Sequence, residues 1–346
     1  MTTVLVEEID AGSKDAGVAA HYGDPIAEQR LIESSVGLVD RSHRDVIAVP
    51  GEERAGWLHT LTTQHLAALG PNQASELLVL SPHGHVEQHA YVTEDGTTAW
   101  LDTEPGAGAG LLTYLESMRF FTRVDPRDAT PEMAVLSLVG PEASAVISDL
   151  AEPQVGAVPG PKFAAGSVPP GATSRYDVRP FMGGLARRVP LGIDLLVPRG
   201  SLADIRAALN VPPAGLLAYE AIRVAHRIPR LGWETDHRTI PAEAGFQAAA
   251  VHLDKGCYRG QETIARVHHL GRPPRRLVLL HLDGIATDNP PPHGTPVTLD
   301  GRGIGFVGTA VRHHELGMIA LAVVKRNVTD DARLQVGESA AAIDPA

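Results

Sequence analysis

The sequence has a single cysteine, Cys257, among its 346 residues. One cysteine excludes an intrachain disulfide, and such a shortage is typical of a protein kept in the reducing cytosol. Aromatic residues make up only 4% of the chain, so we expect cores built from aliphatic side chains. No apolar run approaches the roughly 18 residues of a membrane-spanning helix. The acidic N-terminal segment also lacks the basic start and apolar stretch of a signal peptide. These absences predict a cytoplasmic globular protein with no membrane contact.

The chain also lacks a basic excess, because its formal net charge is −11. An acidic protein repels the phosphate backbone, whose neutralisation supplies most non-specific affinity for nucleic acids. A nucleic-acid partner is therefore disfavoured. One basic stretch is an exception, and it contains Arg266, Arg272, Arg275 and Arg276. It could receive an anion such as a carboxylate or a phosphate, and it could equally be a solvated connector.

The lone cysteine lies in an unusual setting. Lys255 and Arg259 flank Cys257 at two residues on either side, and Gly256 and Gly260 permit backbone conformations that are closed to other residues. Neighbouring cations favour the thiolate, which is the nucleophilic form of cysteine. A free cysteine often only packs in a core. Here the glycines and cations favour an exposed loop with a thiol that ionises readily, followed by a predicted strand over residues 263–267.

The octapeptide KGCYRGQE, residues 255–262, closely resembles the signature of the YgfZ family. Three weaker resemblances support it: GLVDRSH at 37–43, GIDLLVP at 192–198 and AYEAIRVAHRIPRLG at 218–232. Together these segments extend the resemblance over roughly residues 20 to 345.

The resemblance implies a folate-binding protein linked to the maintenance of iron–sulfur enzymes and to tRNA modification. Its relatives include the aminomethyltransferase (T-protein) of glycine cleavage. The expected ligand is a tetrahydrofolate derivative, the expected partners are iron–sulfur client proteins, and the expected state is a cytoplasmic monomer. Cys257 would be the functional thiol. The supporting residues of the motif would be Lys255, Gly256, Tyr258, Arg259, Gly260, Gln261 and Glu262, and the expected ligand contacts are Arg223, Glu220 and Arg266.

Two departures from the aminomethyltransferases bear on activity. Ala225 stands where those relatives carry an acidic residue that grips the pterin ring, and Gln88 and His89 stand in place of two aspartates. Neither Gln88 nor His89 offers an ionised carboxylate to a folate nitrogen. We therefore expect no glycine-cleavage activity. Folate-dependent aminomethyl or one-carbon transfer is kept as the alternative, and a non-catalytic folate sensor as a third hypothesis.

A histidine-rich strand suggests a metal site at first. His85, Glu87 and His89 alternate and would share one strand face close to His83. The chain has 16 histidines, however, so close pairs arise by chance, and a polar sheet surface is the preferred interpretation. No CxxC spacing is present to support an iron–sulfur cluster. We predict no metal site.

Turn residues and periodicity predict an α+β fold of antiparallel sheets with helices, followed by a C-terminal β-barrel. The predicted organisation is a tail or edge segment at 1–20, a folate-binding region at 21–268 and a barrel at 269–346. The middle region is subdivided near 126–131 and contains a proline-rich loop at 152–171. Helices are predicted at 25–35, 52–66, 108–119, 200–209 and 214–227. Strands are predicted at 46–49, 75–81, 86–93, 98–102, 120–124, 133–139, 172–179, 185–189 and 193–197, and in the barrel at 276–282, 295–299, 303–312 and 318–324.

Overall fold

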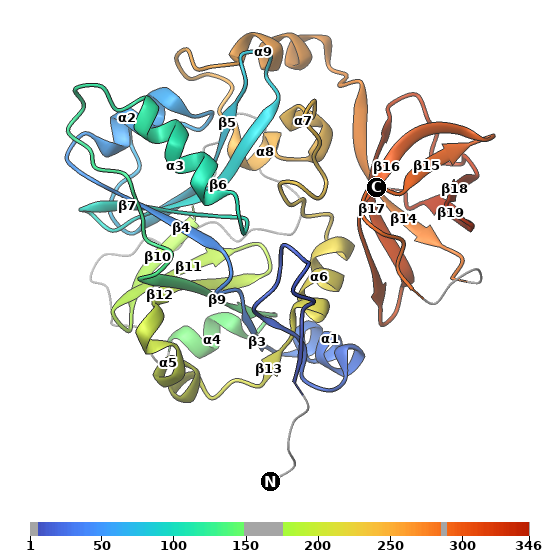
Figure 1. Ribbon diagram of the computed structural model, residues 1–346, viewed down its shortest axis with the longest axis horizontal. Coiled ribbons are helices and arrows are strands. Elements are labelled where there is room, and N and C mark those ends of the chain that lie inside the picture. The colour runs from blue at the N-terminus through green and yellow to red at the C-terminus, as the bar shows by residue number, and fades with distance from the viewer. Residues whose placement is uncertain (1–5, 149–175, 285–288, 346) are drawn as a thin grey trace. The chain divides into compact units, whose positions relative to one another are not determined.

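The computed structural model describes residues 6–148, 176–284 and 289–345 (Figure 1). These residues form two compact units that are interleaved in sequence. The first unit draws on Met1–Val79, Gln88–Tyr219 and Ala248–Tyr258. The second draws on Leu80–Glu87, Glu220–Gln247 and Arg259–Ala346. The predicted proline-rich loop at 152–171 lies outside the described residues.

The first unit is built on an eleven-stranded sheet with the order β13-β3-β9-β12-β11-β10-β5-β6-β7-β4-β8. β13 and β3 pair in parallel, whereas pairs such as β9–β12 and β6–β7 are antiparallel. The strands are β3 Gly37–Asp40, β4 Asp45–Pro50, β5 Gln73–Leu80, β6 Val86–Glu94, β7 Thr98–Thr103, β8 Arg127–Asp128, β9 Met133–Val139, β10 Tyr176–Phe181, β11 Gly184–Val189, β12 Gly192–Pro198 and β13 Pro213–Ala214. A separate pair, β1 Glu7–Glu8 and β2 Ala19–His21, places part of the predicted tail in a small hairpin.

Helices cover two parts of this sheet (Figure 1). The helices α2 Arg54–Leu61 and α3 Gly108–Ser117 lie beside β5, β6 and β7. The helices α4 Ala143–Ser148 and α5 Leu202–Leu209, the latter preceded by a short 3₁₀ turn at Arg199–Ser201, pack beside β9 and β12. The remaining helix of this sheet region, α1 Pro25–Ser34, begins as predicted: Asp24 Oδ1 accepts hydrogen bonds from the backbone N–H groups of Ile26 and Ala27 at 2.9 and 3.0 Å. Such a side-chain cap satisfies N–H groups that the first helical turn leaves without partners.

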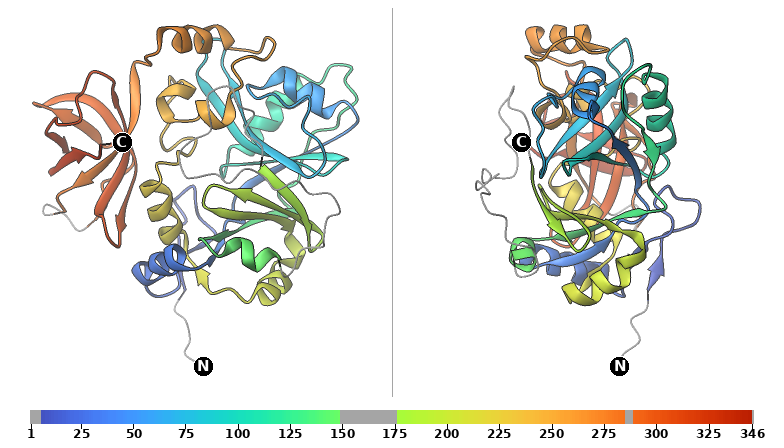
Figure 2. Two further views of the ribbon diagram at one scale, coloured as in Figure 1. Left: turned by 180° about the vertical axis from the view of Figure 1, so that it is seen from behind. Right: turned by 90° about the vertical axis from the view of Figure 1, so that its left-hand side faces the viewer.

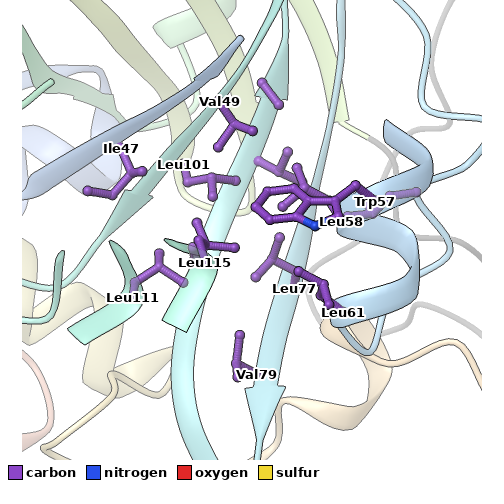
Figure 3. Close-up of a cluster of buried hydrophobic side chains, with 14 of the residues drawn as sticks. Ile47, Val49, Trp57, Leu58, Leu61, Leu77, Val79, Leu101, Leu111 and Leu115 are labelled. Carbon is purple, nitrogen blue, oxygen red and sulfur yellow. The ribbon is translucent and has the colours of Figure 1, made fainter. Parts of the chain in front are cut away.

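The core beneath α2 and α3 is almost entirely aliphatic, as the low aromatic content predicts. Leu58 from α2 and Leu111 and Leu115 from α3 meet Val49 and Leu101 from the sheet (Figure 3). One indole, that of Trp57, completes this cluster, and its Nε1 donates a hydrogen bond to Met118 O at 3.0 Å. The helix predicted at 52–66 buries Trp57, Leu58 and Leu61, but it ends at Leu61 because the backbone of Thr62 is extended.

The second unit contains the predicted barrel, which closes in the order β14-β17-β16-β15-β18-β19 (Figure 2). Its strands are β14 Arg275–Leu282, β15 Pro296–Leu299, β16 Arg302–His313, β17 Gly317–Lys325, β18 Leu334–Val336 and β19 Ser339–Ile343. Against the outside of the barrel, Ala221 and Val224 of helix α6 Leu216–Ala225 pack on Leu279 and Ile319. The remaining helices of the described residues are α7 Pro241–Ala244, α8 Gln247–Ala250 and α9 Gln261–Leu270.

Two predicted strands are wrong. Residues 263–267 belong to helix α9, which starts after Gly260 in the left-handed region and buries Ile264. The β-branched residues there suggested a strand, but Ile264 and Val267 are spaced three apart, as one helix face requires. Residues 120–124 form a turn in which Phe120 has a positive φ and Phe121 is fully exposed.

The described residues include no helix with the length and hydropathy needed to span a membrane.

Candidate functional site

The cysteine lies at the end of a loop that is bonded to the sheet region of the first unit. His252 N donates to Thr63 O at 3.0 Å, and Thr63 Oγ1 donates to Ala250 O at 2.6 Å. Gln64 Nε2 adds a hydrogen bond to Ala249 O at 2.8 Å. The following residues, 252–258, are called the cysteine loop below. Cys257 is exposed at its end.

Lys255 fixes the cysteine loop to the C-terminal end of α2. Its Nζ donates to the backbone oxygens of His59, Thr62 and Gln64, the last at 3.1 Å. The last carbonyls of a helix have no partners within the helix and carry a partial negative charge, so an ammonium group suits them. The Lys255 side chain also lies 5.1 Å from the ring centroid of the buried Tyr258. Burial lowers the pKa of Lys255 to about 8 and raises the pKa of Tyr258 to about 12.

The second predicted cation, Arg259, has an acidic partner of its own. Its Nη1 lies 3.2 Å from Glu87 Oε2, and both side chains are substantially exposed. Arg259 and Glu87 belong to the second unit, whereas Cys257 belongs to the first. The structure thus places Lys255 on carbonyl groups and Arg259 on a carboxylate, and the predicted stabilisation of a Cys257 thiolate by these two cations stays a prediction.

The two glycines of the motif have different roles. Gly260 has a φ of +82°, and a Cβ atom there would approach Ser81 O to 2.6 Å. Only glycine fits this position without strain. A Cβ atom at Gly256 would meet nothing within 4 Å. The residues that follow begin α9, where Glu262 pairs with Arg266 at 3.3 Å on an exposed face and Gln261 is partly buried.

Three half-buried histidines gather beside the cysteine loop, and the sequence analysis missed them. The ring centroids of His59 and His65 are 4.6 Å apart, and those of His65 and His252 are 5.3 Å apart. The Nδ1 atoms of His59 and His252 accept backbone N–H groups, so in the neutral rings Nε2 carries the proton. Burial, followed by the charge of Lys255, lowers the pKa of His59 to about 4. His59 and His65 lie close together in the sequence, but His252 comes from a distant segment, so no motif joins all three.

A second feature of the first unit is a buried cluster of charged residues that joins β11 and β12 to β7, a strand further along the sheet order, and it is called the arginine cluster below. Arg187 on β11 reaches Asp102 on β7 at 2.6 Å and Asp194 on β12 at 2.9 Å. Arg44 approaches Asp102 at 3.1 Å and Arg41 approaches Asp194 at 3.3 Å. Burial alone raises the pKa of Asp102, but the charges of Arg187 and Arg44 outweigh burial and hold it below its ordinary value. Each buried charge therefore has an opposite charge in contact.

The strand in which histidines were noted in the sequence is β6, and it belongs to the same sheet as the arginine cluster. His89 on β6 is buried and its Nε2 lies 2.9 Å from Glu76 Oε2 on β5. Tyr176 OH donates to the other oxygen of Glu76. Glu87 is exposed and pairs with Arg259, so Glu87 and His89 lie in different environments. A carboxylate is thus present beside His89, and it comes from the neighbouring strand β5, where the linear comparison did not look.

The predicted ligand contacts Arg223 and Glu220 lie together in the second unit, in a buried network. Arg223 donates to Glu220 at 2.6 Å, to Thr309 at 2.7 Å and to Glu234 at 3.3 Å. Arg230 also approaches Glu220, at 3.2 Å. These contacts hold α6 to the barrel, and a ligand contact by Arg223, Glu220 or the exposed Arg266 stays a prediction.

Comparison with solved structures identifies the fold. The glycine cleavage system aminomethyltransferase T from Bartonella henselae superposes with a TM-score of 0.79 at 17% identity, over 99% of this chain and 93% of that one. Residues 20–164 match the GCVT N-terminal domain family.

Sequence comparison agrees with the fold. The chain is 28% identical over 316 residues to an aminomethyltransferase of Geobacillus kaustophilus, covering 87% of this chain and 82% of that one. It is 27% identical over 298 residues to a putative chloroplastic transferase of Arabidopsis thaliana, covering 84% of this chain. The chain spans 65% of the length of that plant relative. Residues 20–164 thus match a GCVT N-terminal domain, and the chain is similar to aminomethyltransferases in sequence and in fold.

Proposed function

We propose that this protein is a YgfZ-like folate-binding protein that uses Cys257 as a functional thiol and supports the assembly or repair of iron–sulfur proteins. It acts as a cytoplasmic monomer, and a link to tRNA modification is implied by the family resemblance. The observation that carries the proposal is the exposure of Cys257 at the end of a loop that Lys255 fixes to α2. A reactive residue needs both access and a rigid support, and this loop supplies both.

The arginine cluster supports a reduced folate as the ligand. A pterin ring presents N–H donors and nitrogen acceptors along its edge, and folate ends in carboxylates. Asp102 and Asp194 already accept from the arginines of the cluster, whereas Arg187 Nε is buried with no acceptor among the residues that the structure describes. A buried donor without a partner costs free energy, which a bound acceptor would recover. Bound folate would supply the nitrogen that accepts a one-carbon unit.

The alternative, folate-dependent aminomethyl transfer, is favoured by the similarity to several aminomethyltransferases over most of this chain. The His89–Glu76 pair gives this alternative a carboxylate. The substitution of both aspartates by Gln88 and His89 weighs against it, and a direct assay separates the two functions.

We expect iodoacetamide to modify Cys257 in the native protein nearly as fast as in the denatured protein, because the side chain is exposed. Mass spectrometry of the intact chain gives both rates, and Cys257→Ser is the unlabelled control. A requirement for denaturant before labelling would contradict the role of the thiol.

Lys255→Met should increase proteolytic cleavage within residues 252–258, because three carbonyl contacts of the ammonium group are lost. Arg259→Gln is the matched control, since it removes only an exposed ion pair worth about 0–1 kcal/mol.

Reduced folates should raise the melting temperature of the protein by a few degrees. Ligand binding to the native state alone stabilises by about 2.7 kcal/mol at a hundredfold excess over Kd, and each kcal/mol shifts the midpoint of a large chain by about 2–4 °C. Tetrahydrofolate and its 5-formyl derivative are tested against glutamate at the same millimolar concentration. Cys257→Ala should keep the shift, and Arg266→Gln should reduce it if the predicted contact exists. No shift with any reduced folate would refute the folate part of the proposal.

A further inference from the structure

A pocket of about 620 Å³ opens in the second unit, away from every residue assigned to a site above. Helix α7 forms one wall through Ala242 and Glu243, strand β14 contributes Arg276 and Leu277, and the loop at 326–330 that follows β17 closes the other side. Its volume is within the range of pockets that bind metabolites, which is about 300–1,000 Å³. All of these residues belong to the same compact unit.

The carboxylates of this pocket are already neutralised. Glu243 is buried, receives Arg275 Nη2 at 2.9 Å and accepts the backbone N–H of Ile240 at 3.1 Å. Asp330 pairs with Arg276. Both acidic side chains therefore have cationic partners within the protein, and neither leaves a negative charge available to a ligand.

The cations of the pocket are paired less completely than its carboxylates. Arg326 is exposed and forms no ion pair within the part of the chain that the structure describes. Arg276 makes both of its hydrogen bonds, to Val328 O and Asp330, through Nη2 alone, and its buried Nε has no acceptor among the described residues. The guanidinium group is a planar fork of donors that matches the oxygens of a carboxylate or phosphate. The uncompensated charge of this pocket is therefore positive.

The structure places three arginines of the basic stretch in different surroundings. Arg266 pairs with Glu262, and Arg275 is held between Asp236 at 2.7 Å and Glu243. Those two arginines serve the fold or an exposed helix face. Arg276 is the member of the stretch that lines the pocket, beside Arg326.

We propose that this pocket binds a small organic anion, with its carboxylate or phosphate on Arg326 and its apolar body on Leu277 and Ala242. The mouth also offers Asn327 and Thr329, whose side chains have no hydrogen-bond partner among the described residues, to hold the remaining oxygens. The proposal stands independently of folate binding, since it uses none of the residues of the arginine cluster or the cysteine loop.

Isothermal titration calorimetry with three probes tests the proposal: phenyl phosphate, benzoate and inorganic phosphate. At least one aromatic anion should bind saturably, and more tightly than inorganic phosphate, because only the aromatic probes cover the apolar side of the pocket. The comparison of phenyl phosphate with benzoate shows which oxyanion the site prefers. Arg326→Gln should weaken binding by about tenfold, the effect of losing a hydrogen bond to a charged group.

Two further variants keep the test specific. Lys325→Gln removes the same charge from the neighbouring residue, which is exposed and does not line the pocket, and it should change Kd by less than twofold. Ala242→Leu keeps every charge but fills the apolar side, and it should weaken the aromatic probes while leaving inorganic phosphate unaffected. Each variant is used after its melting temperature is shown to match the parent. Equal losses in Arg326→Gln and Lys325→Gln, or no saturable binding of either aromatic anion at about ten millimolar, would overturn the proposal.

Discussion

Replacing Arg187 with alanine should lower the free energy of unfolding by about 3–5 kcal/mol, the cost of breaking a buried ion pair by removing one partner. Arg187 is 2% exposed and contacts both Asp102 and Asp194. Without its guanidinium, these two aspartates share only Arg44 and Arg41, and the buried negative charge is no longer balanced. Urea unfolding followed by tryptophan fluorescence measures the change.

The matched control is Arg188→Ala on the same strand. Arg188 is exposed because successive strand residues point to opposite faces, and a surface substitution of this kind usually changes stability by no more than about 0.5 kcal/mol. Comparable losses in the two variants would show that charge alone, and not the buried contacts, determines the effect.

Acid should reduce the difference between the parent protein and Arg187→Ala. Arg187 and Arg44 hold the pKa of Asp102 below its ordinary value in the folded state. Such a carboxylate contributes stability that is present above its unfolded pKa, near 3.9, and is lost as the pH falls through its folded pKa. The advantage of the parent protein should therefore be complete at pH 7 and should shrink below about pH 4. A difference that stays constant from pH 7 to pH 3 would contradict this assignment.

Much of the fold could be predicted because its signals are local. Asp24 followed by Pro25 marks a helix start, and the helix predicted at 108–119 is found at Gly108–Ser117. The barrel was predicted from its first four strands, whereas β18 and β19, with three and five residues, were not recognised. The helix at 261–270 was missed because its β-branched residues favour a strand, and only the left-handed Gly260 and the packing of Ile264 decide otherwise.

The candidate site was predictable in its motif but not in its contacts. The spacing of Lys255 and Cys257 suggested that the ammonium group serves the thiol, since the sequence shows only neighbours along the chain. In the fold, Lys255 bonds to Thr62 O, 193 positions away, and supports the end of a helix. Likewise Glu76 meets His89 through strand pairing. Partners brought together by a sheet leave no spacing in the sequence from which they could be inferred.

In a glycine-cleavage assay, this protein should turn over at least about 100-fold more slowly than the aminomethyltransferase of Geobacillus kaustophilus. The reason is the prediction that Gln88 and His89 stand where the aminomethyltransferases carry two aspartates, since removing one preorganised electrostatic group at such a site typically costs 10²–10³-fold in rate. Glu76 is the carboxylate that contacts His89, but its two oxygens are already bonded to His89 and Tyr176. Its charge is therefore committed to neighbouring side chains and is not available to a folate nitrogen.

The assay combines the protein with the other glycine-cleavage components, tetrahydrofolate and an aminomethyl-loaded carrier, and measures methylenetetrahydrofolate. The relative from Geobacillus kaustophilus is the positive control, and Cys257→Ala shows whether any residual rate needs the thiol. Glu76→Gln separates the two functions further. If Glu76 only supports the fold, this variant lowers stability without changing a background rate. Turnover within about tenfold of the control, abolished by Glu76→Gln and unaffected by Cys257→Ala, would establish aminomethyl transfer with a carboxylate supplied from β5, and the thiol-based function would then have to be abandoned.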